Sequence, residues 1–166
     1  MMDNAEQLDG KQRMEDMLNS EVIGHLGLCA DDETYVVPLN FTYADGQILF
    51  HCALEGAKLD VIKRNPRVCF EISRMEGTPT PHGPDSCDSA FSSVICWGTA
   101  RILEDVAERQ AILNAFLERY STEAHPRKPI SLEQAEKCGG VAITVERMTG
   151  RFFASNEADD RYEWRK

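Results

Sequence analysis

The stretch "TYVVPLNFTYADGQILFHCALEGAK", residues 34–58, carries the pattern that best predicts the fold. Apolar and other side chains alternate along its first ten residues, and this period of two is typical of a strand with one buried face. The residues expected on the buried face are Tyr35, Val37, Leu39, Phe41 and Tyr43. The triplet 44–46, "ADG", predicts a hairpin turn, because glycine accepts the positive φ that such turns need. Residues 47–53, "QILFHCA", should therefore run antiparallel to the first strand.

Two residues of the first strand stand out. Pro38 removes a backbone donor, so it marks either an edge strand or a point where pairing stops. Asn40 can donate and accept hydrogen bonds, which suits the edge of a heterocycle. Across the predicted hairpin these residues should lie near His51 and Cys52, which end the second strand. A histidine in this position is more often a structural residue than a functional one.

A short helix should follow, beginning near Leu54 or Glu55 and ending before Asn65. Lys58 then lies in its first turn, where the helix dipole disfavours a positive charge unless an anion is present. Free N–H groups at a helix start bind anions, most often phosphate, and Gly56 would let the backbone approach closely. Two interpretations remain open at this point: Lys58 binds an anion, or it is a solvated surface residue partly offset by Glu55.

The rest of the chain predicts more strands than helices. A helix is expected over 10–19 and another after Asp105, with Glu108 in a capping-box-like position and Leu113, Phe116, Leu117 and Tyr120 as a core-packing stripe. Strands are expected over 22–30, 67–73, 90–104 with a bulge at Gly98, and 139–153, and a helical turn over 132–137. Residues 74–89 should form an irregular loop, and the polar residues after 153 a partly loose tail.

This order predicts one domain, 1–166, with its core over about 12–150 and a polar tail over 151–166. Hairpin-connected strands dominate, and no β-α-β rhythm, G-x-G-x-x-G or Walker loop is present, which favours an antiparallel barrel or α+β fold over a Rossmann sheet. The net charge of −10 argues against general binding to nucleic acid or anionic membranes. No apolar run is long enough to span a bilayer, and the acidic start lacks a signal-peptide core, so we expect a cytoplasmic protein.

The six cysteines form no C-x-x-C pair, and the four histidines are scattered, so the spacing supports no metal site. Most of the cysteines lie in apolar, strand-like stretches, and we interpret them as reduced core residues. Cys52 is the exception, because it lies next to His51 and close to the predicted anion site.

Three segments in this order resemble a known family: "YVVPLNFTY", "LFHCALEGAKLDVIKRNPRVCFEI" and "SSVICWGTARILED". The chain is similar over residues 12–150 to the pyridoxamine 5′-phosphate oxidase-like FMN-binding split barrels, and within them to the Nim-type nitroimidazole-resistance branch. The resemblance implies a mainly β fold, a six-stranded antiparallel split barrel with flanking helices. It also implies a homodimer with FMN at the subunit interface.

Residue by residue, the resemblance implies a flavin site. Lys58 and the backbone from Ala53 to Gly56 would face the FMN phosphate, so FMN would be the anion for which Lys58 is placed. The ring would be lined by Val37, Pro38, Leu39, Asn40, His51 and Cys52. Ser92, Ser93 and Val94 would reach the flavin bound mainly by the other subunit. His51 matches a histidine proposed as functionally important in Nim-type proteins, so it is the catalytic candidate.

The resemblance implies an FMN-dependent oxidoreductase that reduces a small planar acceptor such as a nitroimidazole, with His51 donating a proton or a hydrogen bond. Ser92 stands where relatives often have a basic residue, which predicts weaker phosphate binding. The substrate-binding C-terminal segment of true pyridoxamine phosphate oxidases is not recognisable, so vitamin B6 chemistry is not expected. The alternatives are a flavin-binding sensor or carrier without turnover, a haem-binding split barrel, and a deazaflavin-binding protein.

Overall fold

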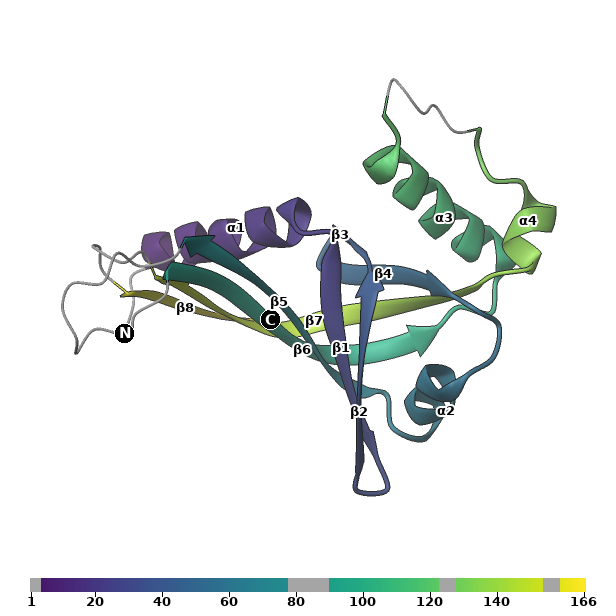
Figure 1. Ribbon diagram of the computed structural model, residues 1–166, viewed down its shortest axis with the longest axis horizontal. Coiled ribbons are helices and arrows are strands. Elements are labelled where there is room, and N and C mark those ends of the chain that lie inside the picture. Colours follow the sequence, from purple (N-terminus) through teal and green to yellow (C-terminus); the bar gives the residue numbers. More distant parts are fainter. Residues whose placement is uncertain (1–3, 78–89, 123–127, 154–158) are drawn as a thin grey trace.

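The computed structural model describes residues 4–77, 90–122, 128–153 and 159–166 (Figure 1). Its described elements form a curled antiparallel sheet with flanking helices, as expected for a split barrel. The helices are α1 (Asn4–Ser20), α2 (Ala57–Arg64), α3 (Val106–Tyr120) and α4 (Leu132–Glu136). The strands are β1 (Ile23–Ala30), β2 (Glu33–Asn40), β3 (Thr42–Ala44), β4 (Gln47–Cys52), β5 (Arg67–Gly77), β6 (Ala90–Ile102), β7 (Gly139–Phe153) and β8 (Asp159–Arg165).

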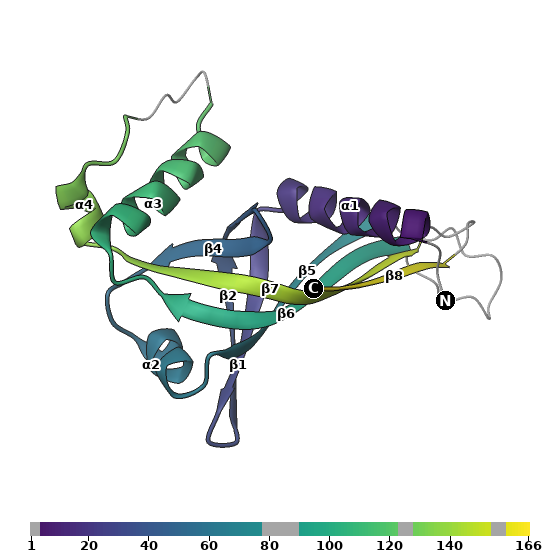
Figure 2. The ribbon, with the colours of Figure 1, turned by 180° about the vertical axis from the view of Figure 1, so that it is seen from behind.

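The strand order is β2-β1-β5-β6-β7-β4-β3, with β8 paired to β7. Strand β7 pairs with β6 along one of its edges. On the other edge, its first half pairs with β4 and its second half with β8, and the sheet splits where β4 gives way to β8. In Figures 1 and 2, α1 lies along the β7–β8 end of the molecule, and α3 with α4 stands at the opposite end. An irregularity is present at Gly98 as expected, since the β6–β7 register shifts between Trp97 and Gly98, but the extra residue is Glu146 of β7.

The predicted strand over 34–43 is interrupted at Phe41, which separates β2 from the short β3. Of these two strands, only β3 pairs with β4. Strand β2 pairs with β1 and forms an edge of the sheet. The edge position expected for Pro38 is therefore confirmed. The direct pairing of residues 38–40 with the end of β4 was wrong, because the chain bends at Phe41, whose buried ring packs edge-on against Phe70 with centroids 4.9 Å apart.

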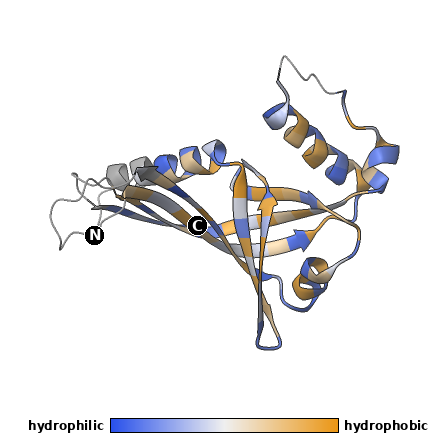
Figure 3. Cartoon of the chain, in the orientation of Figure 1, coloured by the Kyte–Doolittle hydropathy of each residue, from blue (hydrophilic) through white to orange (hydrophobic). Residues whose placement is uncertain are grey.

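The core fills the inside of the curled sheet with large side chains that are completely buried. Figure 3 shows hydrophobic residues along much of β1, β4 and α3. Helix α1 contributes an apolar face to this core, as its spacing predicts, but it begins at Asn4 and not at Gly10. The fully buried residues include Met14, Leu18, Leu26, Ile48, Phe50, Phe70 and Met148.

Three further expectations need correction. The C-terminal residues are not a loose tail over their whole length, because β8 pairs with β7 from Arg147 to Phe153. Residues 74–77 continue β5, and the remainder of the predicted loop lies outside the described residues. Asp105 caps α3 by accepting from the Ala107 N–H, but Glu108 completes no capping box, because it forms an ion pair with Arg101.

Candidate functional site

The start of α2 leaves backbone donors available. The helix begins at Ala57, later than predicted, and its N-cap is Gly56, which has a φ of 137° and no side chain to satisfy the first N–H groups. The first N–H groups of a helix have no acceptor within it, so they remain free for solvent or an anion. A Cβ on Gly56 would meet nothing within 4 Å, so no neighbouring atom crowds that side of the glycine.

Lys58 lies in the first turn of α2, beside these donors. Its side chain is half-buried and makes no hydrogen bond or ion pair with any residue that the structure describes. The other basic residues of α2 differ, because Lys63 pairs with Asp60 at 3.8 Å and Arg64 pairs with Asp31. An unpaired lysine beside free helix N–H groups is the arrangement expected of a phosphate site.

Cys52 connects this helix start to the end of β4. Burial raises the pKa of the Cys52 thiol, and the positive charge of Lys58 opposes that rise, so the two side chains lie close enough to interact. Cys52 pairs with Gly139 of β7, and a Cβ on Gly139 would lie only 3.2 Å from the Cys52 sulfur. Glycine at this position therefore gives the thiol its space.

His51 points to the opposite face of β4 and contacts α3. Its ring meets that of Phe116 edge-on, with centroids 4.9 Å apart and planes at 89°. Desolvation by burial lowers the pKa of His51, which favours the neutral ring near pH 7. A neutral imidazole carries one N–H donor and one acceptor.

A cavity of about 330 Å³ lies beside His51. Asn40 also lines it, so the bend at Phe41 brings these two predicted residues together although their strands do not pair. The predicted core stripe of α3 is only partly core: Phe116 is buried, whereas the other three residues are half-buried and line this cavity. The lining residues are Asn40, His51, Leu113, Phe116, Leu117, Tyr120 and Ile130.

The other predicted site residues are divided between the two faces of the sheet. The side chains of Val37 and Leu39 pack against the core, while Pro38 faces outward. Ser92 and Val94 are buried, and only Ser93 of that triplet turns to the outer face, where it is half-buried. Within one chain this triplet does not line the His51 cavity.

The family model described as pyridoxamine 5′-phosphate oxidase matches residues 10–152, which is most of the chain. The protein belongs to the pyridoxamine 5′-phosphate oxidase-like family.

The proteins that resemble the chain differ widely from it in sequence. A candidate 5-nitroimidazole antibiotic resistance protein from Bacteroides thetaiotaomicron is 25% identical, with a TM-score of 0.73 over 84% of this chain and 82% of its own. An FAD binding protein from Mycobacterium smegmatis is 26% identical, with a TM-score of 0.53 over 86% and 96% of the two chains. The uncharacterized protein RA0666 of Rhizobium meliloti (strain 1021) is 31% identical over 51 residues, which is 31% of this chain and about a third (33%) of that relative.

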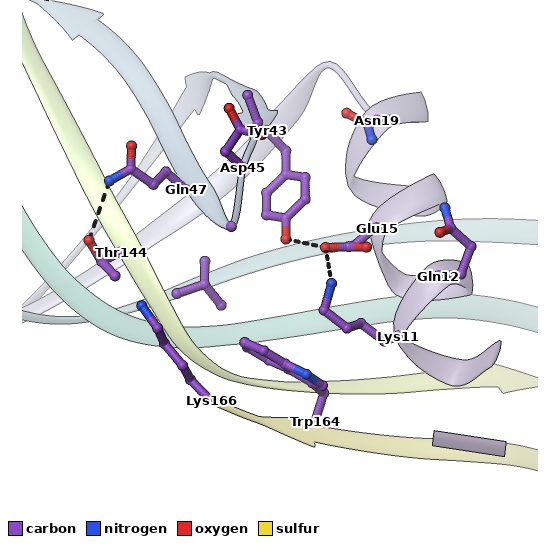
Figure 4. Close-up of a pocket in the computed structure, with 13 residues that line it drawn as sticks. Lys11, Gln12, Glu15, Asn19, Tyr43, Asp45, Gln47, Thr144, Trp164 and Lys166 are labelled. Carbon is purple, nitrogen blue, oxygen red and sulfur yellow. Dashed lines mark hydrogen bonds and ion pairs between the residues drawn. The ribbon is translucent and has the colours of Figure 1, made fainter. Parts of the chain in front are cut away.

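This family member has a second, larger cavity that the sequence did not predict. About 700 Å³ of space lies at the split, where β4 leaves the edge of β7 and β8 joins it (Figure 4). Glu15 accepts hydrogen bonds from Lys11 and from the Tyr43 hydroxyl, each at 2.6 Å, and the Lys11 ammonium lies 5.3 Å from the centroid of Trp164. These residues come from three distant segments, so no local pattern indicated the cavity.

Among the described residues, no helix is long and apolar enough to cross a membrane. No group of three or more His, Cys, Asp or Glu side chains is placed there to hold a metal ion.

Proposed function

We propose that the protein binds FMN and acts as an oxidoreductase that reduces a small planar acceptor such as a nitroimidazole or another nitroaromatic. The observation that carries this proposal is the unpaired Lys58 at the open start of α2, adjacent to the strand end that bears His51 and Cys52. Membership of the pyridoxamine 5′-phosphate oxidase-like family makes a flavin phosphate the anion that fits best. The candidate nitroimidazole resistance protein among the solved structures supports the acceptor.

The phosphate would be held by two kinds of donor. Backbone N–H groups from Ala53 to Gly56 and at the start of α2 would donate to its oxygens, and Lys58 would add a point charge. Gly56 suits this role, because its φ of 137° is rarely adopted by other residues and no side chain obstructs the approach. Ser92 is buried, so it adds no cation to this group.

The ring would lie over the outward residues Pro38 and Asn40 and against the end of β4, where His51 is the catalytic candidate. The flavin would supply the electron transfer, and the chain would supply position, hydrogen bonds and exclusion of water. A neutral His51 can donate its N–H to an oxygen of the acceptor, which stabilises the negative charge that develops there on reduction. Val37, Leu39 and Cys52 would contribute mainly through the backbone and through packing behind the site.

A homodimer would complete the site. The outer face of the sheet exposes apolar side chains, with exposed fractions of 52% for Ile23, 63% for Val36 and 66% for Met75. Ile23 pairs directly with Asn40 across β1 and β2, so the apolar residue Ile23 borders the proposed site. A second copy covering the face would bury it, and its Ser93 would then be available to a flavin bound by the first copy.

The visible absorption spectrum of the purified protein, with mass identification of any released ligand, tests this proposal. We expect a flavin spectrum and the mass of FMN. Lys58→Met should weaken FMN binding by about tenfold or more, since one charge-assisted contact is lost. Lys63→Met removes a lysine from the other end of the same helix and is the matched control. A Soret band, or equal FMN affinity in both variants, would contradict the proposal.

Turnover separates the oxidoreductase from a sensor or carrier. Steady-state consumption of NAD(P)H in the presence of a nitroaromatic acceptor is expected of the enzyme. Flavin binding without such consumption by any donor tested would favour the non-catalytic alternative. Unchanged turnover in His51→Ala would remove the catalytic role of that residue.

A further inference from the structure

The cavity beside His51 is built differently from the proposed phosphate site. Of the seven described residues that line it, four have side chains without a polar atom: Leu113, Phe116, Leu117 and Ile130. Its volume of about 330 Å³ is at the lower end of the range of about 300–1,000 Å³ found for small-molecule pockets. A single ring with its substituents therefore fits, whereas a complete FMN does not.

Some hydrogen-bond donors and acceptors of the lining side chains remain available to a ligand. Asn40 donates one of its two amide N–H groups to the Val22 carbonyl at 2.8 Å, so its second N–H and its amide oxygen remain available. Tyr120 donates its hydroxyl proton to the Phe41 carbonyl at 2.8 Å, so it can only accept. His51 makes no hydrogen bond to any described residue, so its neutral ring offers one N–H donor and one acceptor nitrogen to the cavity.

Among the described residues that line this cavity, none carries a carboxylate, ammonium or guanidinium group. A charged ligand would lose its hydration there without gaining an ionic partner, which disfavours anions and cations alike. The complementary ligand is neutral and planar. It carries an oxygen that accepts from His51 and, on its opposite side, an N–H or O–H that donates to Asn40 or Tyr120.

We propose that this cavity binds the electron acceptor and that α3 sets its specificity, selecting neutral single-ring compounds that bear a nitro or carbonyl oxygen and a ring N–H. The proposal rests on the function proposed above and adds the place, size limit and charge preference of the acceptor. Leu113 and Leu117 form the apolar wall that limits size, and Phe116 holds the His51 ring edge-on. Bicyclic and ionised nitroaromatics are excluded.

Equilibrium binding tests the cavity without relying on turnover. Calorimetric titration with 4-nitroimidazole would be performed on the protein as purified and after removal of flavin. Leu117→Trp fills the cavity and should weaken binding by about tenfold or more, as expected when a shaped apolar pocket loses its space. Leu132→Trp, the same substitution at a 51% exposed residue of α4 outside the cavity, should bind as the parent does. Sodium 4-nitrobenzoate should not bind the parent protein.

A second variant keeps the test valid if Leu117→Trp fails to fold. Leu117→Ala enlarges the cavity and should improve binding of the bicyclic 5-nitroindole by about tenfold relative to the parent. Unchanged affinities in the folded Leu117 variants would overturn the proposal. Loss of flavin from Leu117→Trp but not from Leu132→Trp would also overturn it, since the cavity would then belong to the flavin site. A protein without flavin that still binds 4-nitroimidazole through Leu117 would contradict the flavin function but support the cavity.

Discussion

His51 and Phe116 meet edge to face, with ring centroids 4.9 Å apart and planes at 89°, although 65 positions separate them in the sequence. The contact joins β4, which leads to the proposed phosphate site, with α3, which lines the neighbouring cavity. The Phe116 ring is buried, so it fixes the imidazole orientation and lowers the local polarity. The contact therefore favours the neutral imidazole and holds it beside the cavity.

The neutral state of His51 predicts a pH dependence of stability. Burial lowers its pKa in the folded state, so the unfolded chain binds the proton more readily. The contribution of His51 to the free energy of unfolding is therefore highest above its pKa in the unfolded chain, about 6.5. It decreases as the pH falls toward the lower pKa of His51 in the folded protein. Between pH 8 and 5 the melting temperature should therefore fall less in His51→Gln than in the parent. Parallel melting curves against pH for the two proteins would refute this assignment.

A second contact of α3, between Arg119 and the C-terminal end of α1, predicts a loss of stability when the arginine is replaced. The Arg119 guanidinium donates to the backbone carbonyls of Leu18 at 3.2 Å, Asn19 at 3.0 Å and Glu21 at 2.5 Å. Helix α1 has no basic residue in its last turn, so Arg119 supplies the positive charge that its C-terminal carbonyls favour. We expect Arg119→Met to reduce the free energy of unfolding by about 1–3 kcal/mol, because the carbonyls lose their partner.

Urea unfolding at pH 7 measures the effect, with Arg101→Met as the control. Arg101 pairs with Glu108 at 2.9 Å, but both side chains are about half exposed, and exposed pairs contribute about 0–1 kcal/mol. Equal losses in the two variants would mean that the contact between α3 and the end of α1 contributes no more than a surface ion pair.

Local patterns predicted the strands well, because alternation and turn residues act over short stretches. The 44–46 turn, the β4 strand and the irregularity at Gly98 all follow from a few neighbouring residues. Strand β8 was missed because its only large apolar side chains, Tyr162 and Trp164, alternate with charged residues in a polar context. Its stability comes from pairing with β7 and packing against α1, for example the 2.7 Å ion pair between Arg13 and Asp160.

The site was predicted less completely than the fold, for a related reason. The glycine, the lysine and the strand end at the start of α2 are adjacent in sequence, so their proximity could be expected. The cavity beside His51 could not be, because it depends on where α3 packs after a long intervening segment. An apolar stripe looks the same whether it fills a core or lines a cavity, and only the placement of Leu113 and Leu117 beside His51 distinguishes the two.

The hydrogen bond between Tyr43 and Glu15 predicts a loss of stability when the Tyr43 hydroxyl is removed. Tyr43 is mostly buried and donates to the Glu15 carboxylate at 2.6 Å, while burial and this carboxylate raise the pKa of the phenol. Tyr43→Phe should reduce the free energy of unfolding by about 1–2 kcal/mol, the usual effect of losing a hydrogen bond to a charged group. Tyr35, half-buried on β2, makes no hydrogen bond to any described residue, so Tyr35→Phe should be nearly neutral in the same urea titration. Similar losses in both variants would show that the Glu15 contact adds little.

The close approach of β6 to β7 at Gly98 predicts the largest loss of stability from a single added methyl group. A Cβ on Gly98 would lie 2.1 Å from the backbone oxygen of Thr144 on β7, a neighbour that cannot move without disturbing the β6–β7 ladder. Overpacking of this kind costs about 1–3 kcal/mol, and we expect Gly98→Ala to reach or exceed that range in thermal and urea unfolding. Gly77→Ala provides the control, since a Cβ there meets nothing within 4 Å. If both variants unfold at the same midpoint as the parent, the strands accommodate the added Cβ without loss of stability. Glycine would then not be required at position 98.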